Sequence, residues 1–235
     1  MIEFQNTFKK FGKLSVFEDL NLSIPSSGGI VAVLGPNGSG KTTLIKSILG
    51  MVVPDQGSIF FDGKKIQNEW EYRNEINYLP QIATFPGNLT VHELIEMVKD
   101  LRLKTANEKE LIHKFKLAPF LDKKLSILSG GTKQKVNIVL TFMFESRMLI
   151  LDEPSTGLDP ISLIQLKNLI LEEKKKGKTI LFTTHIMSLA EEISDEIIFL
   201  LEGKIHFRGT IGQIFEKTSQ NNLESSIAKI LEEEE

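Results

Sequence analysis

The chain has 235 residues, of which 41% are hydrophobic, so it can bury a sizeable core as one domain with an inserted subdomain. It contains no cysteine, which excludes disulfides and thiolate metal sites and suits a reducing compartment. A net charge of −3 argues against a broad phosphate-neutralising face, so we expect no nucleic acid partner.

The N-terminal segment, residues 1–30, predicts short antiparallel strands separated by glycine and proline turns. Its first residues lack the pattern of a signal peptide, and no apolar run in the chain is long enough to span a bilayer. We therefore expect a soluble protein whose role at a membrane, if it has one, comes through a partner.

The segment Gly35–Thr42 fits the phosphate-loop pattern G-x-x-x-x-G-K-[ST] at every position. It follows an apolar run, residues 30–34, that is typical of a buried parallel strand. Apolar residues at helical spacing follow it, and Gly50 predicts the end of that helix. An ordinary glycine-rich turn is the alternative, and both flanking patterns argue against it.

The loop is therefore predicted to bind a nucleoside triphosphate, because glycines let amides approach phosphate oxygens and a helix N-terminus carries partial positive charge. Lys41 is expected to reach the β- and γ-phosphates, Thr42 to ligate Mg²⁺, and Thr43 to bond near the α-phosphate. The candidate nucleotide contacts in the loop are Gly35, Pro36, Asn37, Gly38, Ser39, Gly40, Lys41, Thr42 and Thr43.

The middle of the chain changes from strands to helices. Strands are predicted around residues 58–61 and 76–78, and a helical pattern runs from Phe85 to about Met143. Thr90 and Glu93 have the spacing of a capping box, which predicts the start of one of these helices.

Two acidic residues follow the next apolar run, residues 148–151, as at the tip of a buried strand. Ligands bind at that edge of open α/β sheets, so Asp152 is expected to hold Mg²⁺ through water. Glu153 is the best candidate for the base that polarises the attacking water. A strand ending in a solvated acidic turn is the alternative, and the phosphate loop upstream makes it a poor one.

A second buried strand is predicted over residues 179–184, and His185 ends it. Glu202-Gly203 between two apolar stretches, residues 196–201 and 204–207, is a hairpin pattern. Residues after Thr210 are expected to be helical and peripheral.

From about Phe4 to about Gly209 the motifs, in their order, resemble the nucleotide-binding subunits of ABC (ATP-binding cassette) transporters. Leu128–Thr132 (LSGGT) resembles the signature LSGGQ of that family, with threonine in place of the usual glutamine. Tyr78–Gln81 resembles its glutamine loop, and Ser155–Asp159 its D-loop.

The resemblance implies an α/β fold: a P-loop NTPase core with an antiparallel β subdomain and an inserted α-helical subdomain. We expect one ABC ATPase domain over residues 1–235. Within it, residues 1–84 and 147–210 would form the core with the β subdomain, residues 85–146 the helical insert that carries the signature, and residues 211–235 a C-terminal helical tail.

The resemblance also implies roles for the signature and the D-loop. Ser129, Gly130 and Gly131 would open a helix and face the γ-phosphate of ATP bound to a partner subunit. Thr132 keeps a hydroxyl but loses the amide of the usual glutamine. Asp159 would lie at the seam of the dimer and help couple the two sites, and the alternative is a plain turn before a helix that starts at Pro160.

The remaining implied roles concern the nucleotide's other contacts. Gln81 would approach Mg²⁺ and the attacking water, and His185 would contact the γ-phosphate. Phe11 would stack on adenine, although Phe8 competes for this role and a core position is open to either. Val16 would line the same face.

By this resemblance, two copies of the chain would bind two ATP molecules with Mg²⁺ between them and separate on hydrolysis. They would power a separate membrane permease that docks near Gln81–Leu89, which makes the protein cytoplasmic and peripheral on the inner face of the membrane. The subgroup most resembles ATPases of copper-processing and sodium or drug export systems. The alternative is a non-transport ABC ATPase with soluble assembly partners. A phosphate-loop kinase or GTPase is disfavoured, because no Asn-Lys-x-Asp guanine-binding motif is present.

Overall fold

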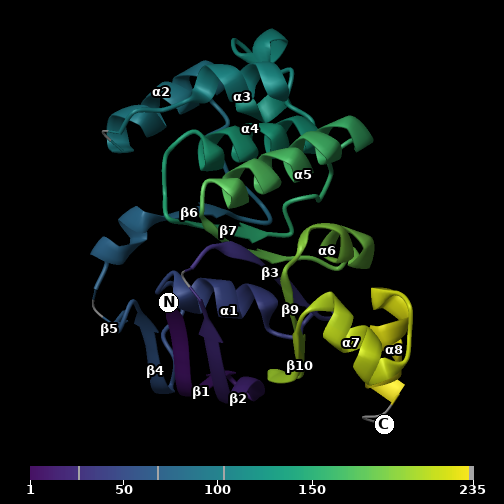
Figure 1. Cartoon of the computed structure of the whole chain (residues 1–235). Helices are drawn as coiled ribbons and strands as arrows, with labels where there is room; N and C mark the ends of the chain where they lie inside the picture. Colours follow the sequence, from purple (N-terminus) through teal and green to yellow (C-terminus); the bar gives the residue numbers. More distant parts are fainter. Residues whose placement is uncertain (26, 68, 103, 233–235) are drawn as a thin grey trace.

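A six-stranded sheet in the order β10-β9-β3-β8-β7-β6 forms the centre of the computed structural model, which describes residues 1–25, 27–67, 69–102 and 104–232 (Figure 1). The strands from β9 to β6 are parallel, and only β10 runs antiparallel to its neighbour. Their bounds are β3 (Gly29–Leu34), β6 (Ile76–Leu79), β7 (Met148–Asp152), β8 (Thr179–Thr183), β9 (Glu196–Leu201) and β10 (Lys204–Gly209).

A second sheet, in the order β2-β1-β4-β5, is antiparallel. Its strands are β1 (Ile2–Phe11), β2 (Leu14–Ile24), β4 (Gln56–Phe61) and β5 (Lys64–Lys65). The short strands predicted for residues 1–30 are wrong, because β1 and β2 are 10 and 11 residues long with one turn at Gly12. The pairing of β1 with β2 contains register shifts, with positive φ at Asn6 and Asp19, and the two strands continue through them.

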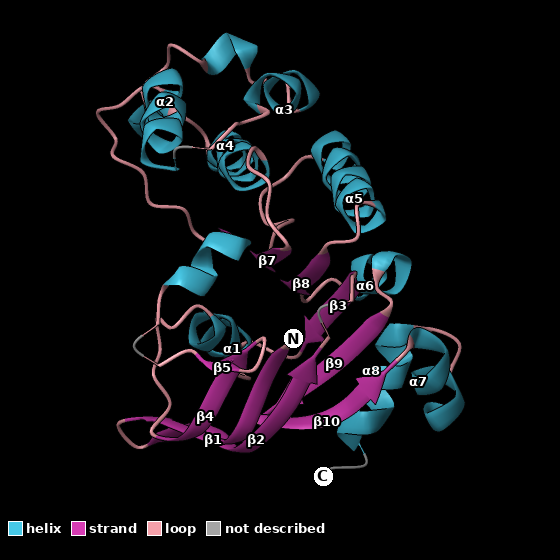
Figure 2. Ribbon diagram, turned by 60° about the vertical axis from the view of Figure 1, so that its left-hand side comes forward, coloured by secondary structure: helices cyan, strands magenta, loops and turns pink. Residues whose placement is uncertain are grey.

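Helix α1 (Lys41–Ile48) lies between the two sheets (Figure 2). Its buried residues Leu44, Ile45 and Ile48 pack with Val31 and Val33 of β3 and with the apolar face of the antiparallel sheet. Neighbouring side chains of β3, such as Ile30 and Ala32, point to the opposite face and join a second core under the other helices. The central sheet is thus covered on both faces, which explains why its strands are almost continuously apolar.

The helices on that opposite face include most of the predicted helical insert. Their bounds are α2 (Val91–Arg102), α3 (Glu108–Lys114), α4 (Gly130–Phe142), α5 (Pro160–Lys175) and α6 (Met187–Ile193). Short 3-10 turns are η1 (Glu71–Glu75), η2 (Ala118–Phe120) and η3 (Leu125–Ile127). The capping box before α2 is present: Glu93 N donates to Thr90 Oγ1 at 3.2 Å, and Thr90 N donates to Glu93 Oε2 at 2.7 Å.

The chain ends in α7 (Ile211–Thr218) and α8 (Leu223–Glu232), which lie beside β10 and α6 (Figure 1). The helical prediction after Thr210 is confirmed here, and residues 233–235 of the predicted tail lie outside the described residues. The buried Leu223, Ile227 and Ile230 of α8 belong to the main apolar core, so this helix is anchored by its own apolar face. The α/β fold class with an antiparallel sheet and inserted helices is confirmed.

Candidate functional site

The phosphate loop connects the end of β3 to the first residue of α1. A Cβ on Gly35 would lie 2.1 Å from the carbonyl oxygen of Leu200, so no other residue fits there. Gly40, with φ 104°, occupies the left-handed region at the N-cap of α1 and makes no side-chain cap. The first turn of α1 also has no acidic residue, which leaves its amides available to an anion.

Lys41 is almost fully buried at the mouth of this loop. Its ammonium donates to the carbonyl oxygens of Gly35 at 2.8 Å and Pro36 at 3.1 Å. Burial lowers the pKa of Lys41, and the charges of Glu153 and then Asp152 oppose that change. The buried Ser39 Oγ has no partner in the described structure, so the loop holds a free polar atom beside its donors. These features fit a polyphosphate.

Asp152 is buried at the carboxyl end of β7, beside the end of β8. Thr183 Oγ1 donates to its Oδ1 at 2.6 Å, and the Thr42 hydroxyl lies 3.4 Å from the same oxygen. Burial, followed by the charge of Asp152, raises the pKa of Tyr78 to about 12. The described residues contain no group of three or more His, Cys, Asp or Glu side chains that could hold a metal. A bound Mg²⁺ here would therefore depend on Thr42, on water beside Asp152 and on phosphate oxygens, which is the usual pattern for this ion.

Glu153 follows with a positive φ of 49°, an uncommon conformation for glutamate that turns the chain away from the strand. Its amide donates to Thr183 Oγ1 at 2.9 Å, and its Oε2 lies 2.8 Å from His185 Nδ1. The prediction that His185 ends its strand is wrong, because β8 stops at Thr183. The Thr184 hydroxyl accepts from the amide of Ile186 at 3.0 Å, and this local turn presents His185 from the loop.

A cleft of about 320 Å³ brings many of the predicted residues together. It is lined by Phe11, Leu14, Val16, Asn37, Gly38, Gly40, Lys41, Thr42, Thr43, Gln81 and Glu153. The apolar side comes from the β1–β2 turn, where Phe11 pairs with Leu14 across the hairpin. Phe8 does not line the cleft. Leu14 is not among the nucleotide contacts predicted from the sequence. The available signal was a leucine directly across the glycine turn from Phe11.

The signature residues lie outside this cleft. The predicted helix start at the signature is present, with Ser129 as the N-cap of α4: its Oγ accepts from Thr132 N at 3.3 Å and lies 2.9 Å from Thr132 Oγ1. Ser129 and Gly130 are both exposed. The hydroxyl of Thr132 thus joins the cap of the helix, so this helix start forms without the usual glutamine.

The D-loop lies beside the signature within the same chain. A Cβ on Gly131 would be 2.6 Å from the carbonyl oxygen of Gly157, so the two segments touch through a glycine. Asp159 caps α5 by accepting from Ser162 N at 2.9 Å, and its other oxygen pairs with Lys135 at 2.7 Å. The predicted helix start at Pro160 is confirmed.

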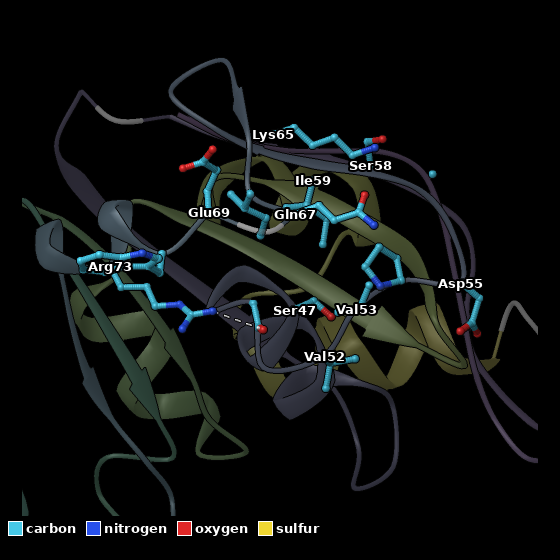
Figure 3. Close-up of a pocket in the computed structure, with 15 residues that line it drawn as sticks. Ser47, Val52, Val53, Asp55, Ser58, Ile59, Lys65, Gln67, Glu69 and Arg73 are labelled. Carbon is cyan, nitrogen blue, oxygen red and sulfur yellow. Dashed lines mark hydrogen bonds between the residues drawn. The ribbon is translucent and has the colours of Figure 1, made fainter.

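A larger pocket of about 520 Å³ lies elsewhere, near the end of α1 (Figure 3). Val52, Val53, Ile59 and Lys65 are among the residues that line it, and Arg73 reaches across to the carbonyl oxygen of Gly50 at 3.4 Å. None of the predicted site residues lines this pocket. Size alone therefore does not locate the nucleotide site, and the chemistry of the loop does.

The fold and the cleft define a phosphate-loop nucleoside triphosphatase with helices inserted between β6 and β7. The family model for the ABC transporter matches residues 17–156. The lantibiotic transport ATP-binding protein SrtF of Streptococcus pyogenes is 34% identical over 209 residues, which cover 87% of this chain and 89% of that protein. The chain belongs to the ABC transporter family, and it is an ATPase of that family.

Two solved structures support the same assignment. The structure of an ATP-binding subunit of an ABC transporter has a TM-score of 0.89 at 30% identity and covers 98% of this chain and 99% of that one. The ATP-binding cassette MJ0796, in a dimeric post-hydrolysis state bound to ADP and Pi, has a TM-score of 0.80 at 25% identity, covering 90% of this chain and 99% of that one. Among the described residues, no helix is long and apolar enough to cross a membrane.

Proposed function

We propose that this chain is the ATP-hydrolysing subunit of an ABC transporter and that two copies close around two molecules of ATP with Mg²⁺. The observation that carries the proposal is the position of the signature: Ser129 and Gly130 are exposed at the start of α4, outside the cleft that the phosphate loop lines. A second copy would bring these residues to the open side of the cleft. The dimeric state of the similar MJ0796 cassette supports this arrangement.

Within one copy, different residues of the cleft act on different parts of ATP. Phe11, with Leu14 and Val16 beside it, offers an apolar surface to the adenine, and the exposed ring of Phe11 is available for stacking. The loop amides and Lys41 hold the phosphates. Glu153 accepts a proton from the attacking water, and His185, hydrogen-bonded to Glu153 Oε2, orients that carboxylate.

Mg²⁺ would be held by Thr42, Gln81 and, through water, Asp152, and when bound it supplies positive charge against the phosphate oxygens. The bond from Thr183 to Asp152 fixes the carboxylate at the tip of β7, facing Thr42. Gln81 lines the cleft from the loop after β6, and Glu153 lines it from the end of β7. The residues present therefore fit the ion and its usual oxygen ligands.

The partner we propose is an integral membrane permease that docks near Gln81–Leu89, which would place the protein at the inner face of the cell membrane. The support is apolar exposure: Ile82, the residue after Gln81, is 79% exposed. Phe85 packs against the helical core, so Ile82 is the more accessible apolar contact in this loop. Soluble assembly partners are the competing outcome.

Gel filtration tests the dimer. The wild-type chain and the Glu153→Gln variant are compared with and without Mg²⁺-ATP, and the variant is expected to retain ATP and elute as a dimer. A variant that binds ATP and stays monomeric at saturation contradicts the proposal.

Affinity purification from detergent-solubilised membranes tests the partner. The wild-type chain is expected to recover a polytopic membrane protein, and Ile82→Asp to lose it. Leu101→Asp is the matched control, because Leu101 is exposed at the far end of α2. Recovery of soluble proteins alone by the wild-type chain favours the assembly role instead.

A further inference from the structure

Three buried polar side chains lie along one face of α4, the helix that begins after Ser129. They are Gln134, Asn137 and Thr141, and all three are at most 6% exposed. Spacings of three and four residues place them on the same side of the helix. Their neighbours Val136, Ile138 and Val139 are apolar core residues, so this polar stripe is a specific departure from an apolar helix face.

The two amides of this stripe bind carbonyl groups in the loops that carry the proposed catalytic residues. Gln134 Nε2 donates to Pro154 O at 3.0 Å, and Pro154 directly follows Glu153. Asn137 Nδ2 donates to Pro80 O at 3.0 Å, and Pro80 directly precedes Gln81. Asn137 Nδ2 also lies 3.4 Å from Gln134 Oε1, which links the two contacts.

These carbonyl groups lie just beyond the strands, since β7 ends at Asp152 and β6 at Leu79. A buried carbonyl without a donor is costly, so the amides hold both loops against α4. Thr141 differs from them, because its hydroxyl donates to Asn137 O of its own helix at 2.9 Å. Its longer contact, 3.3 Å, is to Tyr78 O, and Tyr78 lies inside β6, which is held by its own ladder.

We propose that Gln134 and Asn137 are positioning residues that fix Glu153 and Gln81 to the helix that begins at Ser129. The inference rests on the proposed dimer, in which Ser129 meets the nucleotide of the partner copy. When α4 shifts slightly in response to that nucleotide, it then also moves the two loops that act on the chain's own nucleotide. The two buried amides thus connect the two ATP sites through one rigid helix.

Steady-state kinetics of the full chain with Mg²⁺-ATP test the proposal. Gln134→Met and Asn137→Leu keep the volume of the side chain and remove the donor. Each is expected to lower kcat about tenfold while KM changes less than about twofold, because ATP binding does not use these amides. Thr141→Val is the matched control: it removes a hydroxyl from the same face of α4 and is expected to leave kcat unchanged.

A double-mutant cycle separates positioning from plain loss of structure. If Asn137 acts through Gln81, then Asn137→Leu is expected to lower kcat little further once Gln81→Ala is present. Independent effects that multiply would overturn the proposal, as would unchanged kcat in both single variants. If Asn137→Leu does not fold, as judged by circular dichroism, Asn137→Ser and Gln134→Met carry the same test. A wild-type chain that neither hydrolyses ATP nor dimerises refutes the proposed function, whereas an active wild type with unaffected variants refutes only this inference.

Discussion

His185 and Glu153 are joined by a hydrogen bond, with 2.8 Å between Nδ1 of the imidazole and Oε2 of the carboxylate. The two residues follow adjacent parallel strands, β8 and β7, and differ sharply in exposure: Glu153 is buried and the side chain of His185 is 62% exposed. The bond therefore holds the buried carboxylate of the proposed base to an exposed side chain. It also leaves the far edge of the imidazole free to meet a ligand.

Replacing His185 tests this pairing. His185→Ala is expected to lower kcat for ATP hydrolysis by up to about a hundredfold, because Glu153 loses the partner that orients it and with it part of the rate gain of a positioned base, while ATP affinity changes little. His113→Ala is the control, because His113 is an exposed histidine on α3, which carries none of the candidate residues. Full activity in His185→Ala would remove the imidazole from the mechanism.

The pH dependence of ATP binding tests the environment of Lys41. Burial lowers the pKa of its ammonium in the free protein, and phosphates beside it would raise that pKa again. Because the free form has the lower pKa, Lys41 is neutral in the free protein and charged in the ATP-bound protein at any pH between the two pKa values. Affinity is then expected to fall as the pH rises through the pKa of the free protein, with uptake of a proton on binding between the two pKa values.

Calorimetry in two buffers of different ionisation enthalpy measures that uptake. Lys41→Arg is the control, because a guanidinium stays charged throughout this range and takes up no proton. Apparent binding enthalpies of the wild type that are equal in both buffers at every pH where affinity falls would contradict the linkage at Lys41.

The cap of α5 predicts a stability difference between two variants at one position. Asp159→Ala removes both the cap to Ser162 N and the ion pair with Lys135, whereas Asp159→Asn keeps an oxygen for the cap. Losing an N-cap costs about 0.5–2 kcal/mol and an exposed ion pair less than about 1 kcal/mol. Thermal unfolding is expected to show a melting temperature about 2–4 °C lower for Asp159→Ala, with a smaller change for Asp159→Asn. Equal decreases in melting temperature for the two variants would contradict the role of the cap, because they would show that the negative charge of Asp159 provides the stabilisation.

Asp152 predicts how Mg²⁺ affects nucleotide binding. Asp152→Asn keeps the acceptor for Thr183 Oγ1 but removes the charge facing Thr42. The variant is expected to bind ATP in EDTA like the wild type and to lose most of the gain in affinity that Mg²⁺ confers. A fluorescent ATP analogue titrated with and without Mg²⁺ measures both values. An unchanged response to Mg²⁺ would place the ion away from Asp152.

The local patterns predicted the central elements of the site well. The apolar run before Gly35, the helix that stops shortly before Gly50 and the strand ending at Asp152 all have strong, local chemical reasons, and the structure contains each of them. The predicted hairpin at Glu202-Gly203 is also present, and both turn residues have the positive φ that a two-residue hairpin turn of this kind needs.

Other features depended on tertiary contacts that no short window contains. The strand at residues 58–61 pairs with β1 in the antiparallel sheet. Its own residues do not indicate which sheet or which partner strand it joins. The polar stripe of Gln134 and Asn137 has meaning only because α4 lies against the ends of β6 and β7. The roles of the site residues and the boundaries of the subdomains remain predictions, as does the subgroup of export systems.

The central claim is that Lys41 of one copy and Ser129 of the other act on the same ATP. Lys41→Ala and Ser129→Arg variants, each unable to retain ATP alone, can be mixed and their bound ATP measured after rapid removal of free nucleotide. A mixed dimer contains one intact pair, Lys41 from one chain and Ser129 from the other, so the mixture is expected to retain ATP. A mixture that retains no more ATP than the separate variants would contradict the account, because each chain would then need both residues for itself.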